Sequence, residues 1–384
     1  MALALTSLTQ IAALGFDDII DVRAPAEFTE DHIPGAINLP VLDDVQRAEV
    51  GTTYKQVNPF TARKMGAALV ALNSARHLQG PLADKPGGWR PLVYCWRGGQ
   101  RSGSFASILS QIGWRVELVQ GGYKSWRTLV VQALYEQPFP APVVVLDGNT
   151  GSAKTELLTL LAARGVQVID LEGLARHRGS LFGAMPGGQP SQKAFESALA
   201  MQIAHLDPLR LVVVEAESSK VGECRLPPGL WKAMRAAPRL VIAATAAARA
   251  SYLTRAYSDL TDDKVRLSEV IAKMVPLQSH NTVARWQKMA GMGDYATLAR
   301  ELMEQHYDPR YDRHRARMDQ PMTEFTTASL EEADLAALAD RLVAALQPPS
   351  ASAAASDHIV SPTSTSNTTQ ARGRAITGAS SRAP

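Results

Sequence analysis

Short apolar runs alternate with helical patterns along most of the chain. Runs of three or four apolar residues at 92–94, 143–146, 211–214 and 240–243 have the length and composition of buried strands. Helical patterns are predicted at 105–112, 156–163, 192–206 and 267–275, and a late helix carries leucines at 335, 338, 342 and 346. Strands that alternate with helices predict an α/β protein with a parallel sheet.

The pattern breaks at two places, and each break predicts a boundary. The segment 137–142 is rich in proline, which fixes φ and lacks an N–H donor, so it predicts an extended linker. We therefore expect a first domain at residues 1–137 and a second at 142–347, the second with a helical C-terminal part. Residues 348–384 are rich in Ser, Thr, Ala and Pro and have no hydrophobic period, which predicts a disordered tail.

Composition narrows the class of protein. The hydrophobic fraction of 46% in 384 residues is ordinary for a globular chain of about two domains. No uncharged apolar run reaches the roughly 20 residues of a membrane helix, so we expect no membrane partner. Two cysteines cannot form a disulfide framework, which favours the cytoplasm. The net charge of +3 means that nucleic acid would have to bind to local basic patches.

The first candidate site follows the strand at 92–94. This strand leads into Cys95, which is followed by Arg97, Gly98, Gly99 and Arg101 and then by a predicted helix. Two glycines let the backbone curl so that amides point inward. Inward amides, a helix N-terminus and arginines bind an anion and lower the pKa of a thiol. We therefore predict that Cys95 is a nucleophile or a chalcogen carrier beside an anion loop, and not simply a small buried hydrophobe.

The sequence around this loop resembles the rhodanese family. The resemblance lies in Asp21-Val-Arg-Ala-Pro-Ala-Glu-Phe, in His32-Ile-Pro-Gly-Ala-Ile-Asn-Leu-Pro and in Gly121-Gly-Tyr-Lys-Ser-Trp. It implies a small α/β domain with a parallel sheet and with Cys95 on the loop after a central strand. The remaining cysteine, Cys224, lacks such surroundings, and we expect it to be structural.

The spacing of this loop differs from that of many rhodaneses. Their arginine follows the cysteine by five positions, whereas Arg101 follows Cys95 by six, which is the spacing of cysteine phosphatases. A longer loop makes a wider cradle with room for a tetrahedral phosphorus group. The spacing therefore predicts a phosphorus-containing donor or substrate, and it leaves a rhodanese-fold phosphatase as a rival interpretation.

The second candidate site is a P-loop after the strand at 143–146. The segment 148–155 approximates the pattern G-x-x-x-x-G-K-[ST] between a strand and a helix. Its amides, with Lys154, would hold a pyrophosphate, and Thr155 could bind Mg²⁺. The predicted phosphate-binding residues are Gly148, Gly151, Ser152, Lys154 and Thr155.

Two departures weaken the prediction of nucleotide hydrolysis at this loop. Ala153 stands where the pattern has glycine, which costs about 1 kcal/mol if that position needs a positive φ, and nothing if the position is close to helical. No Walker B aspartate follows the strand at 211–214, and Glu215 and Glu217 occupy its place. These two are substrate contacts or ordinary strand-end carboxylates, and we predict no bound metal beyond Mg²⁺ on a phosphate.

Together the two loops resemble the tRNA 2-selenouridine synthase family over about residues 10–320. The resemblance is densest at 50–55, 94–102, 170–180 and 215–218. It implies an enzyme that converts wobble 2-thiouridine of certain tRNAs to 2-selenouridine through an S-geranyl intermediate. Its co-substrates would be geranyl diphosphate, held at Lys154 and Thr155, and selenophosphate, held beside Cys95.

Basic residues mark candidate contacts with tRNA phosphates. Arg176, His177 and Arg178 lie in a glycine-flanked loop, and a later cluster holds Arg310, Arg313, Arg315 and Arg317. A solvated charged surface is the alternative, above all for the later cluster. Two rivals remain for the chain as a whole. One is a rhodanese-fold phosphatase or sulfurtransferase with an accessory nucleotide-binding domain, and the other is a non-catalytic phosphate sensor.

Overall fold

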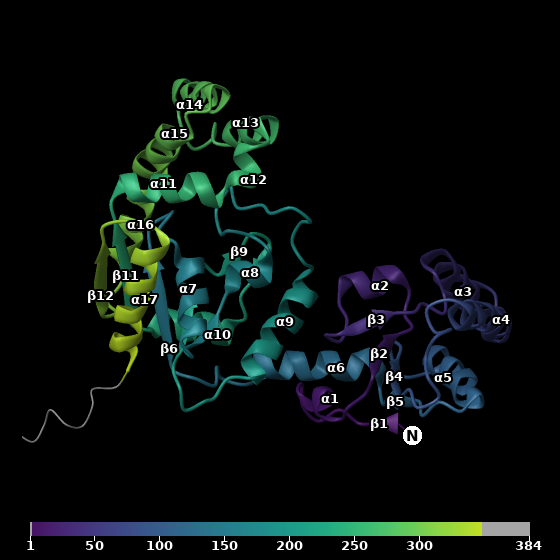
Figure 1. Cartoon of the computed structure of the whole chain (residues 1–384). Helices are drawn as coiled ribbons and strands as arrows, with labels where there is room; N and C mark the ends of the chain where they lie inside the picture. Colours follow the sequence, from purple (N-terminus) through teal and green to yellow (C-terminus); the bar gives the residue numbers. More distant parts are fainter. Residues whose placement is uncertain (1, 348–384) are drawn as a thin grey trace, which may run out of the picture. The chain divides into compact units, whose positions relative to one another are not determined.

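The computed structural model describes residues 2–347 and contains two five-stranded sheets in which all neighbouring strands are parallel (Figure 1). The first sheet has the order β1 (Ala2–Leu3), β5 (Glu117–Val119), β4 (Pro91–Tyr94), β2 (Asp18–Asp21), β3 (Ala36–Asn38). Its helices are α1 (Gln10–Ala13), α2 (Pro25–Glu30), α3 (Asp44–Gln56), α4 (Pro59–Gln79), α5 (Gln100–Ile112) and α6 (Gly122–Val131), which the π-helix η1 (Gln132–Glu136) extends. The central strand β4 ends directly before Cys95, as the rhodanese resemblance implies.

A buried ion pair supports the end of β4. The guanidinium of Arg23 donates to the carboxylate of Asp21 over 2.6 Å and to the backbone oxygen of Asp31 over 2.6 Å. Arg23 also lies over the ring of Tyr123, 4.0 Å from its centroid. A buried charge is tolerated only when it is paired and hydrogen-bonded. The contacts of Arg23 thus join Asp21 and Tyr123, which lie in two of the segments that carry the rhodanese resemblance.

The second sheet is covered by helices on both faces. Its order is β12 (Met322–Thr327), β11 (Arg239–Ala244), β6 (Val143–Gly148), β8 (Val212–Glu215), β7 (Gln167–Ile169). Val213 packs in one core with α7 (Lys154–Ala163) and α17 (Glu332–Leu346), while Val212 and Val214 pack in the other with α9 (Gln192–Ala204) and α10 (Pro228–Ala236). Successive strand residues point to opposite faces, so a strand buried on both sides is apolar throughout. The smaller elements are α8 (Leu171–Ala175) and the antiparallel hairpin of β9 (Lys220–Val221) and β10 (Cys224–Arg225).

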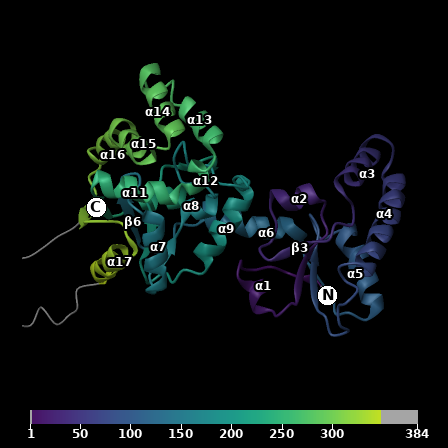
Figure 2. The same ribbon diagram turned by 45° about the horizontal axis from the view of Figure 1, so that its top comes forward.

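A helical part is inserted between β11 and β12. It comprises α11 (Ala246–Ala256), α12 (Ser258–Thr261), α13 (Lys264–Ala272), α14 (His280–Met292), α15 (Tyr295–Leu302), the π-helix η2 (Met303–Tyr307) and α16 (Asp308–Arg315). Figure 2 shows α13, α14 and α15 gathered together, and they share a hydrophobic core around Ile271, Trp286 and Leu298. The helical part returns the chain to the sheet, where β12 pairs with β11 along its whole length.

The structure confirms the predicted α/β fold and its main elements. The four predicted strands are β4, β6, β8 and β11, and the predicted helices are α5, α7, α9, α13 and α17. Helix α13 begins at Lys264, three residues before the predicted start, because the side chain of Asp263 caps it by accepting from the amide of Arg266. Residues 137–142 form no helix or strand, and the predicted tail at 348–384 lies outside the described residues.

The described residues up to Leu346 form one compact unit, and the helices α6 and η1 contact α9 within it. The phenol of Tyr135 donates to Glu196 over 2.7 Å, and Arg127 forms an ion pair with the same carboxylate. Cys224 is buried in the hairpin, and burial raises the pKa of its thiol, so its environment is that of a structural cysteine. Over residues 2–347, no helix has both the length and the apolar character needed to cross a membrane.

Candidate functional site

The Cys95 loop is seated on the start of α6. The amide of Tyr123 donates to the backbone oxygen of Cys95 over 2.8 Å. Gly98 has φ +65°, and a Cβ there would lie 2.8 Å from the backbone oxygen of Val119. A Cβ at Gly122 would overlap the backbone of Cys95. Glycine is therefore required at both positions, which fixes the curl of the loop.

The thiol of Cys95 is prepared to act as a thiolate. Its side chain is 3% exposed, and the hydroxyl of Ser102 donates to its sulfur over 3.2 Å. Burial raises the pKa of Cys95, but hydrogen bonds from Ser102 and the charge of Arg101 outweigh it, so the pKa is lowered. Ser102 is absent from the residues predicted for this site. Its position directly after the arginine of the Cys-x5-Arg motif is the signal that points to it.

The arginine of the loop is paired with a carboxylate. Arg101 donates to Glu27 over 2.7 Å, and Arg47 lies 3.2 Å from the same carboxylate. Burial raises the pKa of Glu27, but the two arginines prevail and hold it below its usual value. An ionised carboxylate has no proton to donate, so Glu27 is unsuited to be the general acid of a phosphatase. Arg97 is exposed and forms no ion pair within residues 2–347.

The P-loop follows β6 and has a strained residue at its turn into α7. Ala153 has φ +57° and ψ +32°, in the left-handed region, and its side chain is buried. Ala153 is therefore not close to helical, which is the conformation in which an alanine at this position would have cost nothing. A left-handed residue other than glycine costs about 1–2 kcal/mol, and the fold must hold it in place.

The polar groups of the P-loop converge where an anion would be held. Lys154 donates to the backbone oxygen of Gly148 over 3.0 Å, and Thr155 donates to Glu172 over 3.1 Å. The hydroxyl of Ser152 is buried and has no hydrogen-bond partner within the described chain. A buried hydroxyl without a partner is costly, and a bound phosphate oxygen would satisfy it. Burial lowers the pKa of Lys154, but nearby acidic side chains raise it above its usual value, so its charge is retained.

A clamp from the helical part holds the P-loop backbone. Arg249 on α11 donates to the backbone oxygen of Thr150 over 3.0 Å, and it pairs with Asp308 on α16 over 2.7 Å. Asn149 donates to Asp308 over 3.0 Å. Neither Arg249 nor Asp308 was predicted, because no local motif marks them. Their role depends on contacts between segments about 60 to 160 residues apart.

Three glutamates lie close together beside the P-loop, and two of them, Glu172 and Glu217, lie near Lys154. Glu215 ends β8 with its side chain fully buried, accepts from the amide of Glu172 over 2.6 Å and leaves its second oxygen without a partner in the described residues. Burial and the neighbouring carboxylates raise the pKa of Glu215 well above its usual value. Burial and the charge of Glu172 also raise the pKa of Glu217 to about 8. The raised pKa values favour the protonated carboxyl groups, and a further cation beside them would reduce their mutual repulsion.

The P-loop, Glu172 and Glu217 line a cleft with a volume of ≈ 830 Å³, whereas Glu215 is not among its lining residues. The predicted residues that line it are Gly151, Ser152, Lys154, Thr155, Arg178, Glu217, Arg310 and Arg315. Residues that line it but were not predicted include Glu172, Trp231, Arg239 and Tyr311. The cleft thus joins a phosphate loop to several cations and aromatic rings, which suits an anionic ligand with an aromatic or apolar part.

Some predicted contacts lie away from this cleft. Arg176 is exposed at the end of α8, and His177 forms a β-bridge with Ala184. Arg313 and Arg317 are exposed and are not among its lining residues. Arg178 is held at the cleft by Asp259 over 2.8 Å. Within residues 2–347, no group of three or more His, Cys, Asp or Glu side chains has the arrangement of a metal site.

Comparison with known proteins places both loops in one family. The family model described as "tRNA 2-selenouridine synthase AAA domain" matches residues 141–270, and the rhodanese-like domain model matches residues 6–129. A protein of Hahella chejuensis named tRNA 2-selenouridine synthase is 34% identical over 327 residues, which cover 76% of this chain and 84% of the relative. The chain belongs to the tRNA 2-selenouridine synthase family.

Other members of the family are similar over shorter segments. Proteins with the same name from Aeromonas salmonicida and Pseudomonas syringae are 39% and 38% identical to this chain. The matched segments cover 66% and 59% of this chain, and 68% and 62% of those relatives. The chain thus spans less than two thirds of the Pseudomonas syringae relative.

Proposed function

We propose that this protein is a tRNA-modifying transferase that replaces the sulfur of 2-thiouridine by selenium. Geranyl diphosphate and selenophosphate would be its co-substrates, and an S-geranyl nucleoside would be the intermediate. The observation that carries the proposal is the presence, in one chain, of an activated thiol in a Cys-x5-Arg loop and a P-loop with an unsatisfied hydroxyl at Ser152. Two separate anion loops suit two anionic donors, and the names of the relatives supply the nucleoside.

The first step alkylates sulfur. The thiouridine sulfur attacks C1 of geranyl diphosphate, an S–C bond forms, and the C–O bond breaks. Diphosphate leaves with the electron pair, and the N3 proton of the base goes to water. Lys154, the P-loop amides and the hydroxyl of Ser152 would stabilise the negative charge that grows on the leaving group.

Mg²⁺ fits this step as a partner of the diphosphate. The hydroxyl of Thr155 and the carboxylates of Glu172 and Glu217 are the protein ligands available, and the diphosphate oxygens would complete the shell. The cation would neutralise charge on the leaving group. Burial and the charge of Glu172 raise the pKa of Glu217 although Lys154 lowers it, so a further positive charge at this site would lower that pKa.

The second step delivers selenium, and the Cys95 loop would carry it. The thiolate of Cys95 attacks phosphorus of selenophosphate, an S–P bond forms, the P–Se bond breaks, and hydrogen selenide leaves as its anion. No element changes oxidation state in this route. Attack of the thiolate on selenium would instead leave phosphorus reduced, which requires an oxidant to reverse. The phosphatase-type spacing of the loop agrees with attack on phosphorus.

Hydrogen selenide then completes the exchange. Its selenium bonds to C2 of the S-geranyl nucleoside, its proton passes to N3, and the C2–S bond breaks to release geranylthiolate, which takes a proton from water. Water hydrolyses the S-phosphocysteine to phosphate and free Cys95. The hydroxyl of Ser102 would stabilise the thiolate of Cys95 as it leaves.

Contacts with tRNA would come mainly from cations at the cleft. Arg178, Arg310 and Arg315 line it beside the P-loop, and Arg97 is exposed next to Cys95. Arginines of this kind bind phosphates and position the RNA without reading its sequence. Trp231 also lines the cleft and offers a face on which a base can stack.

An assay with purified components tests the proposal. The protein is incubated with thiolated tRNA, geranyl diphosphate and selenophosphate, and the nucleosides are then measured by mass spectrometry. Both S-geranyl and seleno-uridine are expected with the unchanged protein. Lys154→Ala should lose geranylation, whereas Lys232→Ala, at an exposed position outside the cleft, should retain it. Cys95→Ser should lose only selenium incorporation, and Cys224→Ser should lose neither.

Two results would contradict the proposal. Absence of both modified nucleosides with the unchanged protein would refute the function as a whole. Equal loss of both activities in Cys95→Ser would refute the assignment of Cys95 to the selenium step. Selenophosphate labelled at phosphorus adds a direct readout, because the label should remain covalently bound to Cys95 after quenching in alkali, where an S-phosphocysteine is stable.

A further inference from the structure

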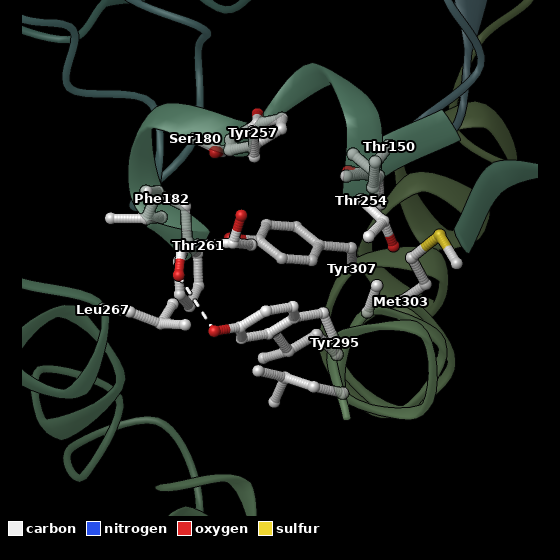
Figure 3. Close-up of a pocket in the computed structure, with 15 residues that line it drawn as sticks. Thr150, Ser180, Phe182, Thr254, Tyr257, Thr261, Leu267, Tyr295, Met303 and Tyr307 are labelled. Atoms are coloured by element: carbon white, nitrogen blue, oxygen red, sulfur yellow. Dashed lines mark hydrogen bonds between the residues drawn. The ribbon is translucent and has the colours of Figure 1, made fainter. Parts of the chain in front are cut away.

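A second cavity, with almost wholly apolar walls, lies beside the P-loop cleft (Figure 3). Its walls come mainly from α11, α13, α15 and η2 of the helical part and include Leu253, Leu267, Leu298, Leu302 and Met303. The phenol of Tyr295 points its hydroxyl at the backbone oxygen of Thr261 and donates to it over 2.9 Å, so the ring presents apolar surface to the cavity (Figure 3). An apolar wall of this kind suits a hydrocarbon ligand.

The apolar cavity and the P-loop cleft share part of their walls. Thr150, Leu253, Tyr257 and Tyr307 line both of them. Thr150 belongs to the P-loop itself, two residues before the unpartnered hydroxyl of Ser152. The shared residues place the apolar cavity next to the P-loop, within reach of a chain attached to a diphosphate that is held there.

We propose that this cavity is the binding site for the isoprenoid chain of the prenyl donor. The inference rests on the proposed function, because it deepens the role of the P-loop by locating the hydrocarbon part of the same substrate. Burial of the chain among leucines and methionine supplies binding energy that a free diphosphate lacks. The cavity thereby makes the site selective for a prenyl diphosphate over the abundant nucleotides that a P-loop also binds.

The size of the cavity selects a short chain. Its volume is ≈ 80 Å³, whereas one water-sized group takes roughly 10–15 Å³, so it admits roughly five to eight such groups. A ten-carbon geranyl chain fits if its first carbons remain between the residues that line both the cavity and the cleft, which we call the shared mouth. A fifteen-carbon farnesyl chain does not fit unless the floor of the cavity moves.

The shared mouth has the chemistry that the alkylation needs. Positive charge grows on C1 of the donor as its C–O bond breaks, and aromatic faces attract such charge. The rings of Tyr257 and Tyr307 line the mouth, and the buried hydroxyl of Tyr307 has no hydrogen-bond partner in the described part of the chain. This hydroxyl can donate to the departing diphosphate.

Calorimetric titration with geranyl diphosphate, farnesyl diphosphate and inorganic pyrophosphate tests the proposal. The unchanged protein should bind geranyl diphosphate at least tenfold more tightly than pyrophosphate. Ala299→Phe fills the cavity from α15 and should abolish this preference while pyrophosphate affinity stays the same. Ala296→Phe changes an exposed residue of the same helix and should keep the preference.

A variant with a larger cavity tests whether the size of the cavity limits the length of the chain that binds. Leu298→Ala should raise the affinity for farnesyl diphosphate relative to geranyl diphosphate at least tenfold. Unchanged pyrophosphate affinity shows that each variant is folded. Equal affinities of the unchanged protein for geranyl diphosphate and pyrophosphate, or a preference that survives Ala299→Phe, would overturn the proposal.

The outcomes also separate this inference from the proposed function. If the protein geranylates tRNA but binds geranyl diphosphate no more tightly than pyrophosphate, the role of the cavity is refuted and the proposed function stands. Selective binding of geranyl diphosphate without transfer to thiolated tRNA would support the cavity and refute the function.

Discussion

The carboxylate of Glu27 on α2 accepts a hydrogen bond from Arg101 over 2.7 Å, so the arginine of the Cys95 loop is already paired. The two residues are 74 positions apart in the sequence. The pair keeps Arg101 beside the loop and at the same time reduces its attraction for an anionic donor. A donor that binds with its own charge must compete with Glu27.

Glu27→Gln should therefore strengthen anion binding at the Cys95 loop. Gln keeps the shape and an acceptor oxygen but removes the charge, and a hydrogen bond to a charged group is worth about 1.5 kcal/mol, or roughly tenfold in affinity. The measurement is protection of Cys95 from iodoacetamide by inorganic phosphate. Glu49→Gln removes an exposed charge on α3 and serves as the control. The same protection in both variants would show that Arg101 does not hold the anion.

Ser102→Ala should slow the alkylation of Cys95 at pH 7. The lost hydrogen bond is one of the contributions that lower the pKa of Cys95, so less thiolate is present at a given pH. Loss of about 1.5 kcal/mol of thiolate stabilisation predicts a rate lower by roughly an order of magnitude. Mass spectrometry after timed exposure to iodoacetamide gives the rate, and Cys224 serves as an internal reference. If the alkylation rate of Cys95 depends on pH in the same way in the variant and in the unchanged protein, Ser102 has a packing role only.

Ala153→Gly should stabilise the protein. Glycine removes the cost of a left-handed alanine but adds backbone entropy to the unfolded chain, which leaves a gain of about 1 kcal/mol and raises Tm by about 2 °C. Ala162→Gly, in the same helix at an exposed position, should lower stability by about 1 kcal/mol. Differential scanning calorimetry measures both. A lower Tm in both variants would mean that Ala153 is not strained.

Glu217→Gln should flatten the dependence of stability on pH. The pKa of Glu217 is raised from 4.5 to about 8, so the folded state binds a proton that the unfolded state releases. The stability that Glu217 contributes by binding this proton is complete below pH 4.5 and is lost as pH rises through about 8. Urea unfolding at pH 6 and pH 9 should show that the unchanged protein loses stability, on the order of 2 kcal/mol more than the variant. An equal loss in both would place the titration elsewhere.

The elements that depend on neighbouring residues were predictable. The strands at β4, β6, β8 and β11 were visible because a strand covered on both faces is a continuous apolar run. The Cys95 loop and the P-loop were visible because each motif lies within eight consecutive residues, although the structure adds Gly122 to the glycines that the Cys95 loop requires.

Other features could not be predicted, because they depend on segments far apart in the sequence. Ala153 was visible as a departure, but its left-handed φ came only with the packed turn. Arg176, His177 and Arg178 are consecutive, yet only Arg178 lines the cleft, where Asp259 holds it from the helical part.

By itself, the sequence determined the class of fold, the family and the positions of the two candidate anion loops, since periodicity and short motifs act over a few residues. Only the tertiary structure decided that Glu27 pairs with Arg101, that Arg249 and Asp308 clamp the P-loop, and that an apolar cavity opens beside Thr150. Each of these joins elements that lie tens of residues or more apart along the chain. The physical reason is that such contacts form only when the chain packs, so they leave no periodic signal in the sequence.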